Sequence, residues 1–167
     1  MAWPHLHIRM NMLKKTIYHA VKYWISVILT MAVIFWMSSG TFSSDNTSRF
    51  IEPIIHFLFP GMQKTDVELL HVLIRKAGHV TEYFILGFFL FRAFRGHSSK
   101  RWSLHWAIYA VVVSAVYAFS DEFHQSFVST RTASFMDVGI DTVGGIVAQI
   151  VIACRKLVVR NRNYSRR

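Results

Sequence analysis

Two short segments of the sequence carry side chains capable of acid–base chemistry. His79, Glu82 and Tyr83 are spaced by three and four residues, so they share one face of a helix. The run Ser120–Gln125 (SDEFHQ) repeats this spacing with an aspartate, a histidine and a glutamine. An imidazole can act as a general base while carboxylates orient it or polarise its partners. The spacing therefore predicts a catalytic or binding site, although no nucleophile motif identifies the reaction.

A third segment would bring carboxylates to the same place. Asp137, Asp141, Gly144 and Ala148 lie on one stripe of a helix, because the last three follow the first by 4, 7 and 11 positions. Small residues allow helices to approach closely within a membrane. We therefore expect this stripe to face the neighbouring helices, and Arg131 to lie in a short loop that covers the group.

The candidate site residues divide into two expected roles. Acid–base or catalytic groups are expected among five residues: His79, Glu82, Asp121, Glu122 and His124. Substrate binding is expected from a second set: Lys76, Tyr83, Gln125, Arg131, Asp137 and Asp141. In that set the lysine and the arginine could hold a phosphate or a carboxylate, the arginine in bidentate fashion. The pattern does not identify a cofactor.

Other interpretations of the same residues stay open. The two histidines with carboxylates would also suit zinc, iron or manganese, although the spacing matches no established short motif such as HExxH. A structural role is the main alternative, since polar side chains can join membrane helices through hydrogen bonds worth about 0.6 kcal/mol each. Transport is disfavoured, because the inner halves of the expected spans are almost wholly apolar. The carboxylates of the metal variant would be Glu82, Asp121, Glu122 and Asp141.

The elements that must position these residues are membrane-spanning helices. Of the 167 residues, 53% are hydrophobic and only 17% are charged, whereas a soluble domain carries about 25% charge. The composition thus excludes an ordinary soluble domain, and the length suits a single domain. A helix needs about 20 apolar residues to cross the hydrocarbon core. Four stretches reach or approach that length: Tyr23–Met37, Gly78–Phe94, Trp102–Phe119 and Val138–Val159.

We predict an all-α integral membrane bundle of four transmembrane helices, with a longer outer loop carrying short interfacial helices. The expected membrane domain is 21–159, between an N-terminal tail of residues 1–20 and a basic C-terminal tail of residues 160–167. A cleaved signal peptide is the less favoured alternative for the first span, because Ser38–Gly40 fits a cleavage site poorly. Translation could start at any of three methionines: Met1, Met10 or Met12.

The distribution of charge predicts the orientation. The net charge is +10, and 14 of the 19 Lys and Arg residues fall in the two tails, in the loop between the second and third spans, or in the span ends that flank them. Cytoplasmic segments are enriched in Lys and Arg, so we expect a cell-membrane protein with both termini in the cytoplasm. All nine acidic residues fall on the outer side. Because the basic residues flank spans, the expected partners are membrane lipids and a lipid-linked cell-wall component, with no nucleic acid.

The outer loop is the longest connection of the chain. Within it, Arg49–Phe59 has a one-sided apolar surface suited to the membrane interface. We expect this segment to be broken at Pro53 and to end at Pro60. A further helix is expected from Thr65 or Asp66, either of which would serve as the N-cap, and this helix would run on into the second span.

A resemblance to the VanZ-like membrane family lies in two segments, Arg75–Gly87 (RKAGHVTEYFILG) and Ser120–Gly145 (SDEFHQSFVSTRTASFMDVGIDTVGG). That family is named for an accessory protein in teicoplanin resistance. The resemblance covers roughly residues 35–148 and implies a multi-pass membrane protein, linked in one member to reduced teicoplanin susceptibility, without a generally established reaction. Where the family often has Pro-Gly before the arginine, this chain has Ser129-Thr130. The matching signature positions are Lys76, His79, Glu82, Tyr83, Asp121, Glu122, His124, Gln125, Arg131, Asp137, Asp141 and Gly145.

Overall fold

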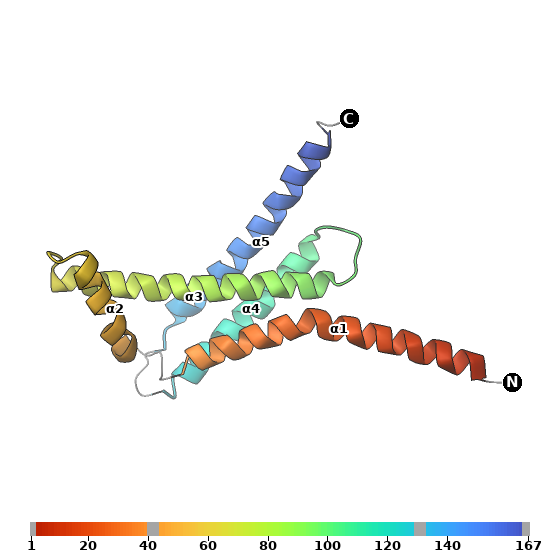
Figure 1. Ribbon diagram of the computed structural model, residues 1–167, viewed down its shortest axis with the longest axis horizontal. Helices are drawn as coiled ribbons and strands as arrows, with labels where there is room; N and C mark the ends of the chain where they lie inside the picture. Colours follow the sequence, from red (N-terminus) through yellow and green to blue (C-terminus); the bar gives the residue numbers. More distant parts are fainter. Residues whose placement is uncertain (1–2, 40–43, 129–132, 165–167) are drawn as a thin grey trace.

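The computed structural model describes residues 3–39, 44–128 and 133–164, and this part of the chain is helical without any strand. The helices are α1 (Trp3–Met37), α2 (Ser44–Leu58), α3 (Lys64–Arg95), α4 (Leu104–Gln125) and α5 (Phe135–Tyr164), as drawn in Figure 1. The prediction of an all-α fold is confirmed. Three of the expected spans lie inside longer helices, whereas the expected span Trp102–Phe119 begins two residues before α4, which starts at Leu104.

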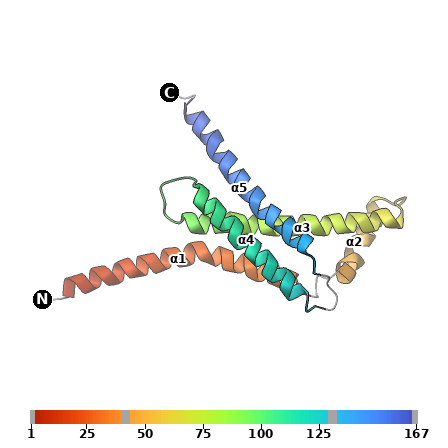
Figure 2. The same cartoon turned by 180° about the vertical axis from the view of Figure 1, so that it is seen from behind.

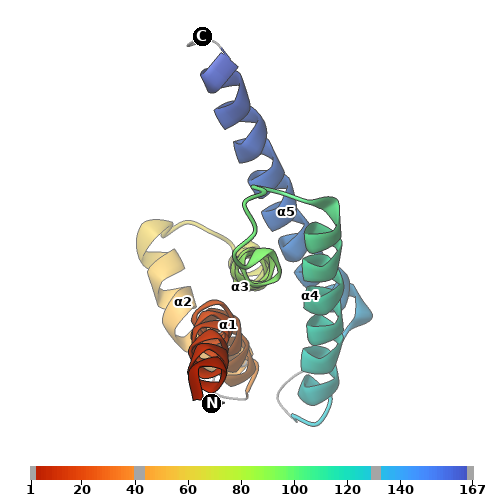
Figure 3. The same cartoon turned by 90° about the vertical axis from the view of Figure 1, so that its right-hand side faces the viewer.

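Helix α3 forms the centre of the bundle. It contacts each of the other four helices, and the view along its axis shows α1 and α2 on one side and α4 and α5 on the other (Figure 3). Its side chains Tyr83, Leu86 and Leu90 are completely buried. The core of the molecule therefore runs along α3.

Helices α3 and α5 approach each other through glycines. A Cβ added at Gly144 would clash with the carbonyl oxygen of Val80, and a Cβ at Gly87 would lie 3.0 Å from the Cα of Gly145. Ala148 is completely buried on the same stripe of α5. The prediction that small residues turn this stripe toward the bundle is confirmed, because only side chains this small permit such close backbone contact.

Three helices are long and apolar enough to cross a membrane within the described residues: Met12–Met37, Leu104–Gln125 and Phe135–Lys156. A membrane bundle is therefore plausible, whereas a fourth span is not established by length and composition. Of the four expected spans, the one in α3 is not among these three helices. Its apolar part follows a charged first half that contains Arg75 and Lys76. Since α3 is surrounded by other helices, much of its surface contacts protein, and its sequence does not need to be apolar on every side.

Two details of the outer loop differ from the sequence-based expectations. Helix α2 is not broken at Pro53 but continues through it, and α2 packs on α3. Before the proline, Thr47 Oγ1 lies 3.2 Å from His71 Nε2, and after it the side chain of Ile55 is buried. These tertiary contacts compensate for the backbone hydrogen bond that proline removes.

The start of α3 also differs from the prediction, because the helix begins at Lys64 with Gln63 as its N-cap. Thr65 and Asp66 lie inside the first turn, so neither is the cap. The expectation that this helix runs unbroken into the second apolar stretch is confirmed, since α3 is continuous to Arg95.

Both ends of the chain extend from the bundle as helices. Figure 2 shows the N-terminal part of α1 and the C-terminal part of α5 diverging beyond the packed region. The expected boundaries at residues 20 and 160 do not coincide with helix ends, because α1 begins at Trp3 and α5 ends at Tyr164. The division into a membrane domain and two tails stays a prediction.

Candidate functional site

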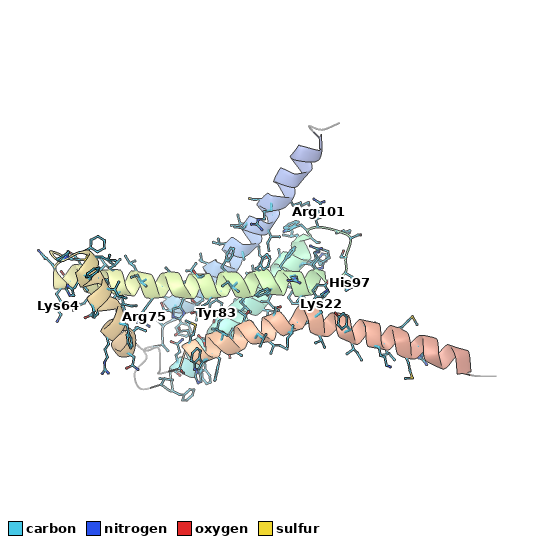
Figure 4. All side chains as sticks on the ribbon, viewed as in Figure 1. Lys22, Lys64, Arg75, Tyr83, His97 and Arg101 are labelled. Carbon is cyan, nitrogen blue, oxygen red and sulfur yellow. The ribbon has the colours of Figure 1, made fainter. Side chains whose placement is uncertain are left out.

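Polar side chains from four segments converge at one end of the packed region. The end of α1, the end of α4, the start of α5 and the middle of α3 are joined there by hydrogen bonds and ion pairs. Figure 4 shows Tyr83 at this point, midway along α3. We call the residues that meet there the polar cluster: Ser38, Lys76, His79, Tyr83, Asp121, Glu122, Gln125, Asp137 and Asp141.

The first part of the polar cluster ties α1 to α4. Ser38 donates its hydroxyl proton to Asp121 Oδ2 over 2.6 Å. The side chains of Ser38, Asp121 and Gln125 are all buried. Gln125 Nε2 donates to the same carboxylate oxygen over 3.0 Å and also to Ser38 Oγ over 3.2 Å. Asp121 and Gln125 share a face of α4, as their spacing predicted. The closed triangle of hydrogen bonds gives this group a clear structural role.

The second part places Asp141 against α3. Its side chain has no exposed surface, and its Oδ1 lies 3.6 Å from Nδ1 of His79, whose side chain keeps 21% of its surface exposed. Neither carboxylate oxygen of Asp141 accepts a hydrogen bond from the residues that the structure describes. The hydroxyl of Tyr83, completely buried on the same helix as His79, also lacks a hydrogen-bond partner in this part of the chain. A buried carboxylate behind a partly exposed imidazole can orient that ring for proton transfer or binding.

The third part surrounds Glu122. The backbone N–H of Ser134 donates to Glu122 Oε2 over 2.8 Å, so this buried carboxylate holds the segment that leads into α5. Beside it lies an open pocket of 240 Å³, lined by Glu122, Ser126, Ala133, Ser134 and Val138 together with three phenylalanines. The phenylalanines are Phe119, Phe123 and Phe135. The exposed surface of the pocket is almost wholly apolar, with Glu122 and two serines contributing little of it.

The rim of the polar cluster carries an ion pair between α3 and α5. Lys76 Nζ lies 2.7 Å from Asp137 Oδ1, with 38% and 34% of the two side chains exposed. Glu82 is half-buried on the same part of α3. Because Lys76 already has a carboxylate partner, an anionic ligand would have to compete with Asp137 for it.

Two further predicted site residues are His124, which contacts an aromatic ring, and Arg131, which lies outside the described residues. His124 stacks on Phe35, with ring centroids 4.4 Å apart and planes tilted by 37°, and its Nδ1 is buried without a hydrogen-bond partner among the described residues. Arg131 lies outside the described residues, as do Ser129 and Thr130. The expected cover of the polar cluster by Arg131 therefore stays a prediction.

Sequence analysis missed Ser38 as a member of the site. The signal was present, since Ser38 directly follows the first apolar stretch and so had to lie at the same depth as the end of α4. The metal variant gains no support: the described residues contain no group of three or more His, Cys, Asp or Glu side chains placed to hold a metal ion. His79 and His124 belong to different contacts, with Asp141 and with Phe35.

Comparison with known families identifies one family. The family model described as VanZ/LLP1 matches residues 23–157, which includes all of the polar cluster. The chain belongs to the VanZ/LLP1 family. Neither the curated proteins nor the solved structures gave a match. The VanZ/LLP1 match begins at Tyr23 and ends at Leu157, so it spans the helices that pack around α3 and excludes the diverging ends of α1 and α5.

Proposed function

We propose that this VanZ/LLP1 family member is a four-span protein of the cell membrane whose polar cluster faces the outer side. The cluster binds or acts on a lipid-linked component of the cell wall. Through that activity the protein lowers susceptibility to the glycopeptide teicoplanin, as the resemblance implies for one member of the family. The observation that carries the proposal is the burial of Asp141 beside His79.

Asp141 supports a functional role because its position is energetically unfavourable for a purely structural residue. Buried polar groups in folded proteins nearly always have hydrogen-bond partners, and ionisable groups within membrane segments are costly and usually functional. Both oxygens of Asp141 lack such a partner in the described residues. We infer that the bundle tolerates this cost because the carboxylate acts on His79 or on a bound ligand.

The pocket beside Glu122 supports an amphiphilic ligand. Three phenylalanines give the pocket an apolar wall, and the buried Glu122 is among the residues behind it. Ligand pockets commonly combine an apolar lining with a few polar groups that fix orientation. A lipid-linked molecule would place its chain against the aromatic rings and its polar part toward the polar cluster.

The position of α3 supports the fourth span and the orientation. The apolar stretch Gly78–Phe94 is enclosed by α1, α4 and α5, so it would cross the bilayer together with them. Basic residues gather at the end opposite the polar cluster, as in Arg92, Arg95 and Arg101. The positive-inside rule then favours cytoplasmic termini.

A structural role is the second candidate, and the Ser38–Asp121–Gln125 group favours it. Those side chains hydrogen-bond to one another across two helices through Asp121 Oδ2, which suits a structural function, although Asp121 Oδ1 has no hydrogen-bond partner among the described residues. We assign Asp121 and Gln125 to this role. Catalysis or binding is then left to His79, Glu82, Glu122 and His124, and ligand contacts to Lys76, Tyr83, Arg131, Asp137 and Asp141.

The test compares teicoplanin and vancomycin susceptibility in a sensitive Gram-positive host. The arms are wild type, Asp141→Asn, Glu122→Gln and empty vector, at matched membrane abundance. Both substitutions keep the shape of the side chain and replace one carboxylate oxygen with an amide NH2 group, which removes the acid–base function. The wild type is expected to raise the inhibitory concentration of teicoplanin, and both variants are expected to lose that effect.

The matched control is Glu68→Gln, which makes the same chemical change on the exposed first part of α3. This variant should protect as the wild type does. If Asp141→Asn and Glu122→Gln also protect fully, the polar cluster is structural. If no arm protects although the protein is abundant, the proposed teicoplanin role is wrong for this chain.

A further inference from the structure

A second pocket lies at the end of the bundle opposite the polar cluster. It has a volume of 340 Å³ and is bounded by α1, the end of α3, the loop before α4, and α5. Three arginines line it, together with aromatic and aliphatic side chains that include Tyr23, Phe88 and Ile152. We call it the basic pocket. Figure 4 shows Arg101, His97 and Lys22 gathered at this end of the molecule.

The local structure brings the three arginines together. Arg92 and Arg95 lie one turn apart at the end of α3, and the chain then turns at Gly96 with a φ of 51°. A positive φ of this size favours glycine. The turn reverses the chain so that Arg101 lines the same pocket. Gly96 therefore contributes to the pocket by directing the loop.

Aromatic contacts hold the first of these arginines at the pocket wall. The guanidinium carbon of Arg92 lies 5.7 Å from the centroid of the Tyr23 ring. His97 meets that ring edge-on, with centroids 5.4 Å apart. A cation over an aromatic ring is attracted by the electrons of the ring face. Tyr23 thus fixes Arg92 while leaving its N–H donors available.

The positive charge of the basic pocket has no acidic partner. None of the ion pairs between described residues involves Arg92, Arg95 or Arg101. All nine acidic residues of the chain lie in the outer loop or near the polar cluster in sequence. A group of guanidinium ions without carboxylates attracts an anion, and arginine matches the geometry of phosphate oxygens.

The rest of the lining indicates where the anion comes from. Phe88, Phe91 and Ile152 make one side of the basic pocket apolar, which a fully hydrated anion would not need. A molecule with a phosphate beside a hydrocarbon chain satisfies both sides at once. Basic pockets between transmembrane helices bind the headgroups of anionic lipids.

We propose that the basic pocket is a binding site for an anionic phospholipid. The phosphodiester group contacts Arg92, Arg95 and Arg101, and the adjoining acyl chain lies against Phe88 and Ile152. This site is separate from the polar cluster and does not depend on the function proposed for it.

The test measures lipid binding to the purified full-length chain by native mass spectrometry in detergent. Phosphatidylglycerol and phosphatidylcholine with the same acyl chains are compared. We expect tighter binding of phosphatidylglycerol. The double variant Arg95→Gln/Arg101→Gln should weaken it about 30-fold, since each basic residue near the headgroup contributes about fivefold.

The matched control is Lys100→Gln/Arg155→Gln. Lys100 and Arg155 are exposed residues near the same end of the bundle, and neither lines the basic pocket. This control removes the same net charge and should bind phosphatidylglycerol within about twofold of the wild type. Equal weakening by both double variants would mean that general surface charge attracts the lipid, and the proposal would be wrong.

Two further arms separate the remaining explanations. Arg101 lies outside the helices, so Arg101→Gln by itself should leave the fold intact and still weaken phosphatidylglycerol binding about fivefold. Glycerol phosphate is added as a soluble competitor, at the same concentration at which phosphatidylglycerol saturates the protein. We expect little displacement, because it lacks the acyl chain. Full displacement would identify a soluble phosphate ligand instead and overturn the assignment to a lipid.

Discussion

Charge is treated differently at the two ends of the bundle. At the polar cluster, carboxylates lie inside the protein: Asp121, Glu122 and Asp141 are buried between helices. At the basic pocket, the arginines lie on the outside, and all three are exposed. The carboxylates contact Ser38, Ser134 and His79, whereas Arg92 contacts the face of an aromatic ring.

The difference follows from the length of the side chains. Long cationic side chains can extend along apolar surface and place their charge near the headgroups. Aspartate and glutamate are too short to do this, so a carboxylate on the bundle side of a helix stays inside and needs partners there. The polar cluster is therefore fixed by contacts between helices, while the basic pocket keeps its cationic groups exposed.

The largest expected effect comes from filling the close contact that supports the polar cluster. In Gly144→Ala the new Cβ would clash with the backbone oxygen of Val80, which should cost about 1–3 kcal/mol of stability as in other overpacked sites. Gly139→Ala is the control on the same helix, because its Cβ would meet nothing within 4 Å. Unfolding in mixed micelles measures both. Equal stability of the two variants would contradict the observed contact between α3 and α5.

A smaller loss is expected when the hydrogen-bonded group is opened. Asp121→Ala removes the acceptor of Ser38 and Gln125, and two membrane hydrogen bonds together contribute about 1–2 kcal/mol. Glu68→Ala, which removes an exposed partner of Lys64 at 3.9 Å, should change stability by less than about 0.5 kcal/mol. The same unfolding measurement compares the two variants. An equally small loss of stability in both would show that the buried hydrogen bonds of Asp121 contribute no more than an exposed ion pair.

The rim of the polar cluster should give an intermediate result. Lys76 and Asp137 are each about one-third exposed, so solvent screens their attraction. A double-mutant cycle with Lys76→Ala and Asp137→Ala should give a coupling energy of about 0.2–1 kcal/mol. Raising the salt concentration should reduce it. A coupling energy of several kcal/mol would contradict this expectation and show that solvent does not screen the pair.

The smallest effect is expected at the opposite end. Arg155→Gln changes an exposed residue of α5 that lies outside the basic pocket. Stability should stay within about 0.5 kcal/mol of the wild type. A clear loss of stability in mixed micelles would show that the basic residues hold the bundle together, and the contrast between the two ends would disappear.

Several features of the fold could be predicted from the sequence. The residues at offsets of three and four do share helix faces, and the stripe with Asp141, Gly144 and Ala148 does face the bundle, because helical periodicity is a local property. The continuity of α2 through Pro53 could not be predicted in the same way. It accompanies the packing of α2 on α3, where Thr47 contacts His71, and such contacts join segments distant in the sequence.

The membership of the site divides in a similar way. Spacing identified Asp121 and Gln125 as neighbours on one helix, but their shared partner Ser38 is 83 residues from Asp121 along the chain. Nothing local to Ser38 distinguishes it from Ser39, whose hydroxyl instead bonds to the backbone of Trp36. The rotation of α1 against α4 decides between the two serines.

By itself, the sequence determined the class of this protein: apolar helices for a membrane, acidic residues toward one end and basic residues toward the other. Those properties follow from the composition of each segment and from the order of the segments along the chain, so they do not depend on tertiary contacts. Only the tertiary structure decided that α3 lies at the centre and that Asp141 lies behind His79. It also decided that Arg101 turns back to join Arg92. These outcomes depend on how closely helices can approach, and backbone contacts such as those at Gly144 and Gly87 set that distance.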